Sequence, residues 1–177
     1  MVLRLVIAIL GVAAVATASD YVWYEIGVGH TRIAGVITGA VMLGAVGAAL
    51  GWSAGRLVAG LPLGIFAGVG GALAYYGIGS MMGRGNYGPM IPAWMLCWII
   101  LAIGEGKLLR SRPWGEIFTR GIAAAILSGL AFYAVSATLW GRPPAGGRNY
   151  LVQFAMWVGA WAPGMLAIGL GGGSKKR

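Results

Sequence analysis

Few side chains in this sequence have the chemistry that catalysis needs. The 177 residues include four acidic residues, one histidine and one cysteine. His30 is the only imidazole, so a site that needs two imidazoles from one chain is excluded. Cys97 lies inside an apolar run, where a free thiol usually only packs. The sequence has no H-E-x-x-H, C-x-x-C or phosphate-binding loop motif, and we therefore expect a protein that is not an enzyme.

The four acidic residues are expected at the ends of apolar segments and not at their centres. Charged side chains inside a membrane span usually mark ion pathways or proton relays. Asp20, Glu25 and Glu116 fall in the connections between apolar runs. Glu105 is expected at headgroup level, as one member of a solvated pair with Lys107. This distribution argues against a pump driven by protons or sodium ions.

Two groups of residues are candidates for binding a small molecule. Trp157, Trp161, Pro163 and Gly164 lie together in the last apolar segment and form a possible solute site. A proline past the middle of a span frees backbone carbonyls, and broken helices line substrate sites in some transporters. His30 is a weak candidate for ligating a haem or a chlorophyll. No other cofactor and no metal site is predicted.

The composition indicates a membrane protein. Hydrophobic residues make up 59% of the chain and charged residues 10%, whereas a soluble domain carries about 25% charged residues. The net charge is +9. The basic residues lie between apolar runs and at the C-terminus, without a continuous basic face, so we expect no nucleic-acid partner.

The apolar segments predict an all-α bundle that crosses the membrane about six times as one domain, residues 1–177. The first segment ends on Ala16-Thr17-Ala18, which resembles a signal-peptidase site, and we favour a first helix that is retained over one that is cleaved. The predicted spans are residues 3–19, 32–52, 57–79, 89–104, 121–141 and 150–170.

The cations predict the orientation of the bundle, because cytoplasmic connections carry an excess of Lys and Arg. With both termini inside, nine cations fall on the cytoplasmic side and four on the outer side. We therefore expect both termini in the cytoplasm, and a bacterial-type inner membrane as the location. The inner cations are Arg4, Arg56, Lys107, Arg110, Arg112, Arg120, Lys175, Lys176 and Arg177, and the outer ones are Arg32, Arg84, Arg142 and Arg148.

Two polar segments complete the predicted domain. Residues 105–120 alternate apolar and basic side chains, which is typical of a cytoplasmic segment that lies in the membrane interface. We expect four of its cations to meet lipid headgroups: Lys107, Arg110, Arg112 and Arg120. Residues 171–177 predict a flexible basic tail.

Small residues recur every fourth position in the second and third segments. This spacing places them on one face of a helix, where small side chains let another backbone approach closely. The sequence therefore predicts helix packing through Gly/Ala faces. The predicted packing residues are Gly35, Gly39, Gly44, Gly47, Gly51, Gly60, Gly64, Gly68 and Ala72.

Three functions are compatible with these features. The first is a small structural or accessory subunit of a membrane protein complex, whose partners are lipids and either other membrane subunits or copies of itself. The alternative is a small transporter or channel for a neutral or apolar solute, which would require a cavity that reaches the middle of the membrane near Pro163. A pigment- or haem-binding subunit that uses His30 is the weaker third hypothesis.

Overall fold

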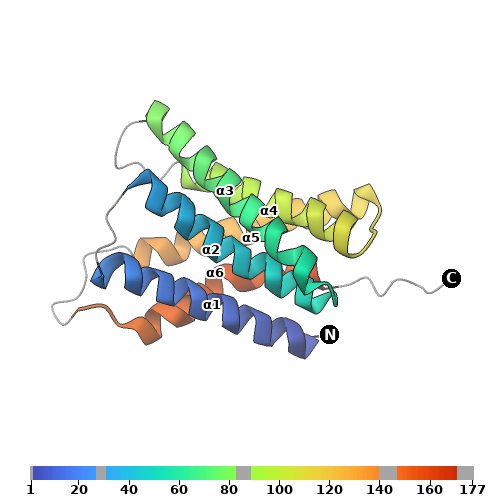
Figure 1. Cartoon of the computed structure of the whole chain (residues 1–177), viewed down its shortest axis with the longest axis horizontal. Coiled ribbons are helices and arrows are strands. Elements are labelled where there is room, and N and C mark those ends of the chain that lie inside the picture. The colour runs from blue at the N-terminus through green and yellow to red at the C-terminus, as the bar shows by residue number, and fades with distance from the viewer. Residues whose placement is uncertain (1, 27–30, 83–88, 140–146, 171–177) are drawn as a thin grey trace.

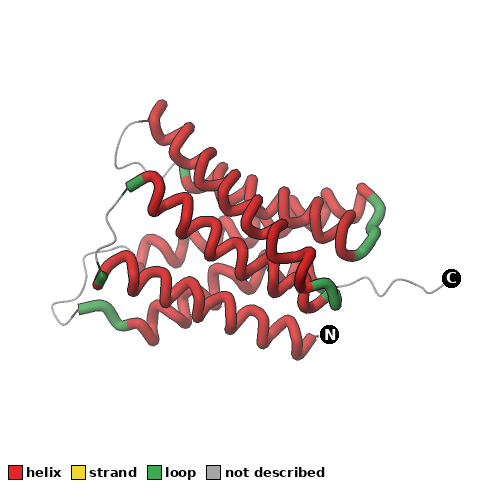
Figure 2. Tube along the Cα trace, in the orientation of Figure 1, coloured by secondary structure: helices red, strands yellow, loops and turns green. Residues whose placement is uncertain are grey.

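Six long helices build the protein. The computed structural model describes residues 2–26, 31–82, 89–139 and 147–170, and these residues are almost entirely helical (Figures 1 and 2). A five-residue π-helix, Glu105–Leu109, directly continues the fourth helix. The helices are α1 (Val2–Glu25), α2 (Arg32–Ser53), α3 (Leu57–Met82), α4 (Met90–Gly104), α5 (Trp114–Leu139) and α6 (Tyr150–Gly169).

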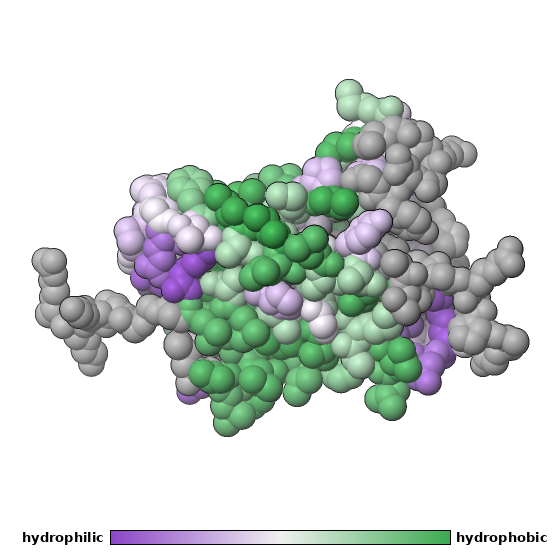
Figure 3. All heavy atoms as spheres, turned by 180° about the vertical axis from the view of Figure 1, so that it is seen from behind, coloured by the Kyte–Doolittle hydropathy of each residue, from purple (hydrophilic) through white to green (hydrophobic). Residues whose placement is uncertain are grey.

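All six helices are long and apolar enough to cross a bilayer, if α4 is taken together with the π-helix. The predicted all-α protein with about six membrane helices is thus confirmed. Large apolar side chains cover the outside of the bundle; Val58, for example, is 87% exposed and Leu151 78%. Figure 3 shows hydrophobic residues across the middle of one face and hydrophilic residues toward its two ends. This surface suits acyl chains, and the protein is an integral membrane protein.

The helices form a closed ring. Each helix packs against the next one along the chain, and α6 packs back against α1. One end of the ring holds the start of α1, the turn between α2 and α3, and the π-helix (Figure 1). The end of α6 lies at the same end, because its last residue, Gly169, contacts Leu5 of α1. We call this the N-terminal end. The opposite end holds the end of α1 and the starts of α2, α4 and α6.

The closest packing in the ring joins α2 and α3. A Cβ atom added to Gly47 would collide with the backbone of Gly60 and Gly64, and one added to Gly68 would collide with the carbonyl oxygen of Gly39. Only glycine permits such backbone contact, since any side chain would push the helices apart. The tight turn that joins the two helices contains Gly55, whose φ of +73° favours glycine.

Two helices extend six or more residues beyond the predicted spans, both at polar residues. Helix α1 continues to Glu25, six residues past the predicted end at residue 19, so Asp20 belongs to the helix. Helix α5 begins at Trp114 and not at residue 121. The predicted interfacial segment is therefore the π-helix, a turn at residues 110–113 and the first turns of α5. The predicted spans are shorter than these helices, because a helix can extend at either end past the residues that lipid covers.

Candidate functional site

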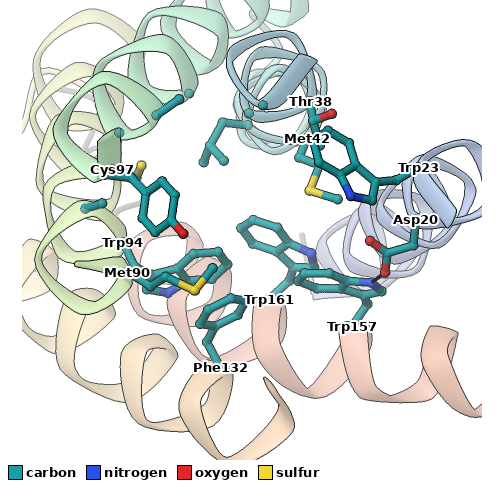
Figure 4. A pocket seen from close by; sticks show the side chains of 18 of the residues that line it. Asp20, Trp23, Thr38, Met42, Met90, Trp94, Cys97, Phe132, Trp157 and Trp161 are labelled. Atoms are coloured by element: carbon teal, nitrogen blue, oxygen red, sulfur yellow. Dashed lines mark hydrogen bonds between the residues drawn. The ribbon is translucent and has the colours of Figure 1, made fainter. Parts of the chain in front are cut away.

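A cavity of about 550 Å³ lies inside the ring and opens at the end opposite the N-terminal end. This volume is within the range of small-molecule sites in proteins, about 300–1,000 Å³. Residues of all six helices line it, as the close-up in Figure 4 shows. Because no single helix builds the cavity, its walls exist only when the ring is closed.

The cavity reaches the middle of the bundle and stops there. Met42, one of its lining residues, is the eleventh of the 22 residues of α2. One turn further toward the N-terminal end, the helices present buried side chains that do not line the cavity. Ala16, Val46, Leu101 and Met165 are each fully buried in this layer. The cavity is therefore a deep vestibule that a packed layer closes at its inner end.

Asp20 supplies a buried carboxylate to the cavity wall. The residue is 8% exposed, and its Oδ2 accepts two hydrogen bonds, from Gln153 Nε2 at 2.5 Å and from Trp157 Nε1 at 2.6 Å. Both donors are neutral groups of α6. Burying a carboxylate is costly unless hydrogen bonds or opposite charges compensate it. Asp20 is therefore a buried residue of the cavity wall, and it is the acid most relevant to a site.

The sequence contained a signal for this site that hydropathy did not show. The buried residues of α1 follow a helical stripe through Val12 and Ala16, and Asp20 continues it one turn further. On α6, Gln153, Trp157 and Trp161 are spaced by four residues and share one face. These two stripes meet at the hydrogen bonds of Asp20.

Aromatic rings form much of the remaining wall. Trp94 stacks on Phe132 with ring centroids 4.1 Å apart, and it also lies 4.6 Å from the ring of Trp161. Trp157 stacks on Trp161 at 5.8 Å. These four rings come from α4, α5 and α6 and line the cavity together (Figure 4). They offer flat apolar faces to a solute.

A buried hydroxyl holds Trp94 in this wall. Ser128 Oγ accepts a hydrogen bond from Trp94 Nε1 at 3.1 Å and donates one to the Ala160 carbonyl oxygen at 2.8 Å. Ser128 is fully buried. The serine thus connects α4, α5 and α6 on the cavity side of the bundle.

The rim of the cavity carries a cation. The guanidinium carbon of Arg148 lies 3.6 Å from the centroid of the Tyr24 ring, and both residues line the opening. Next to it, outside the lining, Tyr150 donates a hydrogen bond to Glu25 Oε1 at 2.7 Å. These contacts attach the end of α1 to the start of α6.

The predicted solute site is divided by the structure. Trp157 and Trp161 line the cavity, whereas Pro163 and Gly164 do not. A Cβ added to Gly164 would collide with the ring of Trp98, which fills the space beneath the cavity. His30, the weak candidate for a haem or chlorophyll, lies outside the described residues. Within the described part of the chain, no three potential metal ligands come together.

A second cluster of polar residues closes the N-terminal end of the bundle. Glu105 is 1% exposed and forms ion pairs with Arg110, at 2.5 Å, and with Arg112, at 3.6 Å. The expected solvated pair of Glu105 with Lys107 is therefore wrong. Arg112 Nη1 donates to the Ile168 carbonyl oxygen at 3.0 Å, and Arg120 Nη1 donates to that of Ala167 at 3.1 Å. These cations satisfy carbonyl groups that the end of α6 leaves unpaired.

The four cations predicted at lipid headgroups all have partners within the protein. Arg112 is 5% exposed, and burial lowers the pKa of its guanidinium while the charge of Glu105 opposes that change. Arg110 also donates to Ser53 Oγ at 3.2 Å. Arg120 binds Glu116 at 2.8 Å. Lys107 donates to the Arg112 carbonyl oxygen at 3.3 Å and lies over the ring of Trp114. A role for these four at lipid headgroups stays a prediction.

Two further motifs occur in the sequence, although we expected no G-x-S-x-G pattern. Judged from the described residues, neither motif has the structural context of an active site. Residues 51–55, GWSAG, match the G-x-S-x-G pattern of serine hydrolases. Ser53 lies at the end of α2 and donates to its own helix, to the Leu50 carbonyl oxygen at 2.8 Å, whereas the motif requires a strand-to-helix turn. Residues 83–88, GRGNYG, match a dinucleotide-binding pattern but follow a helix and lie outside the described residues.

Comparison with known proteins found no relative: no family model, no curated protein and no solved structure matches this chain. Any functional assignment therefore depends on the site itself.

Proposed function

We propose that this protein is a small membrane transporter that binds an organic solute in the cavity. The observation that carries the proposal is the cavity of about 550 Å³, which opens at one end of the ring and reaches the middle of the bundle. Transporters commonly bind their substrates near the midplane of the bilayer. An opening on one side, with a packed layer on the other, corresponds to one of the two states that alternating access requires.

The glycine contacts favour this proposal over the accessory subunit. That hypothesis took the glycine faces as evidence for association between helices, including helices of other subunits or copies. The faces of α2 and α3 instead contact each other within one chain, as Gly47 does with Gly64 and Gly39 with Gly68. They are therefore not free for another subunit. An accessory role, or a homo-oligomer, stays a prediction that needs a different surface.

The direction of the opening follows from the predicted orientation. The N-terminal end of the ring carries six of the described cations: Arg4, Arg56, Lys107, Arg110, Arg112 and Arg120. The cavity end carries Arg32 and Arg148 among the described residues. By the positive-inside rule the N-terminal end faces the cytoplasm. The vestibule then opens on the outer side of the membrane and is ready to accept a solute from there.

A cavity-filling variant tests the proposal. Thr38 lines the cavity from α2, and its neighbour Ile37 is 58% exposed on the outer face of the same helix. Thr38→Phe adds a ring inside the cavity, and Ile37→Phe adds the same ring on the lipid side. Neither variant changes the number of tryptophans, so quenching of the intrinsic fluorescence can report solute binding in both.

The probes are four solutes that share a phenyl ring and differ in charge: phenethylamine, 2-phenylethanol, phenylacetate and phenylalanine. Binding is measured on the purified protein. Flux is measured in proteoliposomes with radiolabelled probes, and only with those probes that do not leak out of liposomes without protein. We expect at least one probe to bind and to be transported, and Thr38→Phe to abolish both while Ile37→Phe retains them. Equal binding by the two variants would overturn the cavity as the site, and binding without flux would overturn transport.

A further inference from the structure

We propose that the solute of this cavity is an organic cation whose positive group binds at Asp20. This inference rests on the proposed function and names the substrate class of the same site. The transporter that the sequence analysis gave as an alternative was expected to carry a neutral or apolar solute, and Asp20 was expected in a connection between apolar segments. Its place in the cavity wall changes that expectation.

The surroundings of Asp20 favour a positively charged ligand. The two groups that donate to its carboxylate, Gln153 and Trp157, are neutral, and both bind Oδ2. Oδ1 accepts no hydrogen bond from the described residues. A carboxylate on an apolar wall gains most from a cation placed against it, because the low dielectric strengthens their attraction.

The aromatic wall supplies the second half of a cation site. The faces of aromatic rings are negatively polarised and attract ammonium groups, most strongly where water is displaced. Trp157 combines both functions, since its N–H binds Asp20 while its ring stacks on Trp161 within the lining. A ring on the solute can pack against the wall that Trp94, Phe132 and Trp161 form, and Asp20 lines the same cavity (Figure 4).

Arg148 carries a positive charge at the rim, which a cationic ligand has to pass on its way to Asp20. It precedes α6, whereas Gln153 and Trp157 lie about 5 and 10 Å along the axis of that helix from its first residue, Tyr150. Asp20 is thus deeper in the cavity than Arg148, whose guanidinium lies over Tyr24 at the rim. A zwitterion would use both charges, whereas a simple cation would be opposed by Arg148. Removing the charge of Arg148 should therefore weaken the binding of a zwitterion and tighten the binding of a simple cation.

The test uses the same four phenyl-ring probes and measures their dissociation constants by tryptophan fluorescence. We expect phenethylamine, an ammonium at neutral pH, to bind about tenfold more tightly than 2-phenylethanol. Asp20→Asn keeps a side-chain oxygen for Gln153 and Trp157 and removes only the charge. It should therefore abolish the preference for phenethylamine, so that this probe binds no more tightly than 2-phenylethanol.

Two further variants complete the test. Glu25→Gln removes a carboxylate from the same end of α1 but outside the lining, and it should keep the preference for the cation. Arg148→Gln should tighten the binding of phenethylamine. The assignment of a cationic solute is overturned if Arg148→Gln weakens the binding of every probe. It is also overturned if phenylalanine binds more tightly than phenethylamine.

The failure of this inference is distinguishable from that of the proposed function. One outcome is that neutral probes bind the parent but not Thr38→Phe, while Asp20→Asn behaves like the parent. This outcome would overturn the assignment of a cationic solute and retain the cavity as the binding site. If no probe of any charge binds the parent, both the inference and the proposed function are overturned.

Discussion

Glu105 Oε1 lies 2.5 Å from Arg110 Nε, and the π-helical turn between these two residues produces this contact. In an α-helix, residues five positions apart point in different directions, whereas a π-helix brings them onto the same side. The backbone N–H of Arg110 also donates to the Glu105 carbonyl oxygen at 3.0 Å. The turn thus directs a cation onto a carboxylate that is 1% exposed.

Removal of the Glu105 carboxylate should strongly destabilise the protein. Glu105→Ala leaves Arg110 and Arg112 buried without their shared counter-charge, and breaking a buried ion pair by removing one partner costs about 3–5 kcal/mol. We expect a large decrease in the melting temperature of the protein in mild detergent. The matched control is Glu116→Ala, because Glu116 is 34% exposed and its pairs with Arg112 and Arg120 should contribute about 1 kcal/mol or less. Equal losses for the two variants would contradict the argument.

Alanine at Gly64 should separate α2 from α3. The added Cβ would collide with the carbonyl oxygen of Leu43, which is backbone and cannot rotate away. Overpacking of this kind costs about 1–3 kcal/mol, and a backbone collision belongs at the upper end of that range. Gly77→Ala, in the same helix, meets nothing within 4 Å and should not destabilise the protein. Thermal unfolding followed by circular dichroism distinguishes the two, and a tolerated Gly64→Ala would show that the two backbones are not in contact.

The sequence predicted the number and the approximate places of the helices, because each span needs about 20 apolar residues and few other segments supply them. It also predicted the small-residue spacing of α2 and α3, but not which faces would meet. Spacing shows that Gly47 and Gly64 each lie on a face rich in small residues. It does not show whether that face is covered by the same chain or by another subunit.

The cavity could not be predicted, because empty space results from contacts between residues far apart in the sequence. Asp20 and Trp157 are separated by 137 positions, and only the closure of the ring between α1 and α6 brings them together. Asp20 also follows an apolar run and precedes several aromatic residues, which is typical of the membrane interface. Its burial depends on α1 continuing past residue 19, and hydropathy does not determine where a helix ends.

Loss of the Ser128 hydroxyl should destabilise the wall of the cavity. Ser128→Ala leaves the Trp94 N–H without its acceptor, and an unpaired buried donor costs about 1–3 kcal/mol. We expect a lower melting temperature and a changed fluorescence spectrum, since the environment of Trp94 changes. Thr119→Ala removes a hydroxyl of the same helix that is exposed and bonds only to its own backbone, and it should have little effect.

The interaction of Ser128 with Trp94 can be measured separately by a double-mutant cycle. Trp94→Phe removes the indole N–H, so in that background Ser128→Ala should cost less than it does in the parent. If the cost is the same in both backgrounds, the bond between the two side chains contributes nothing to stability.

The direction in which the cavity opens can be tested by cysteine labelling in intact cells. Cys97 lines the cavity, so the labelling starts from a Cys97→Ala variant, which contains no other cysteine. A cysteine at Ala145, in the connection between α5 and α6, should be labelled from outside the cell if the cavity faces outward. A cysteine at Ala54, in the turn between α2 and α3, should be labelled only after the cells are opened. The reverse pattern would place the termini outside the cell and the cavity mouth in the cytoplasm, and a solute would then have to enter the vestibule from inside the cell.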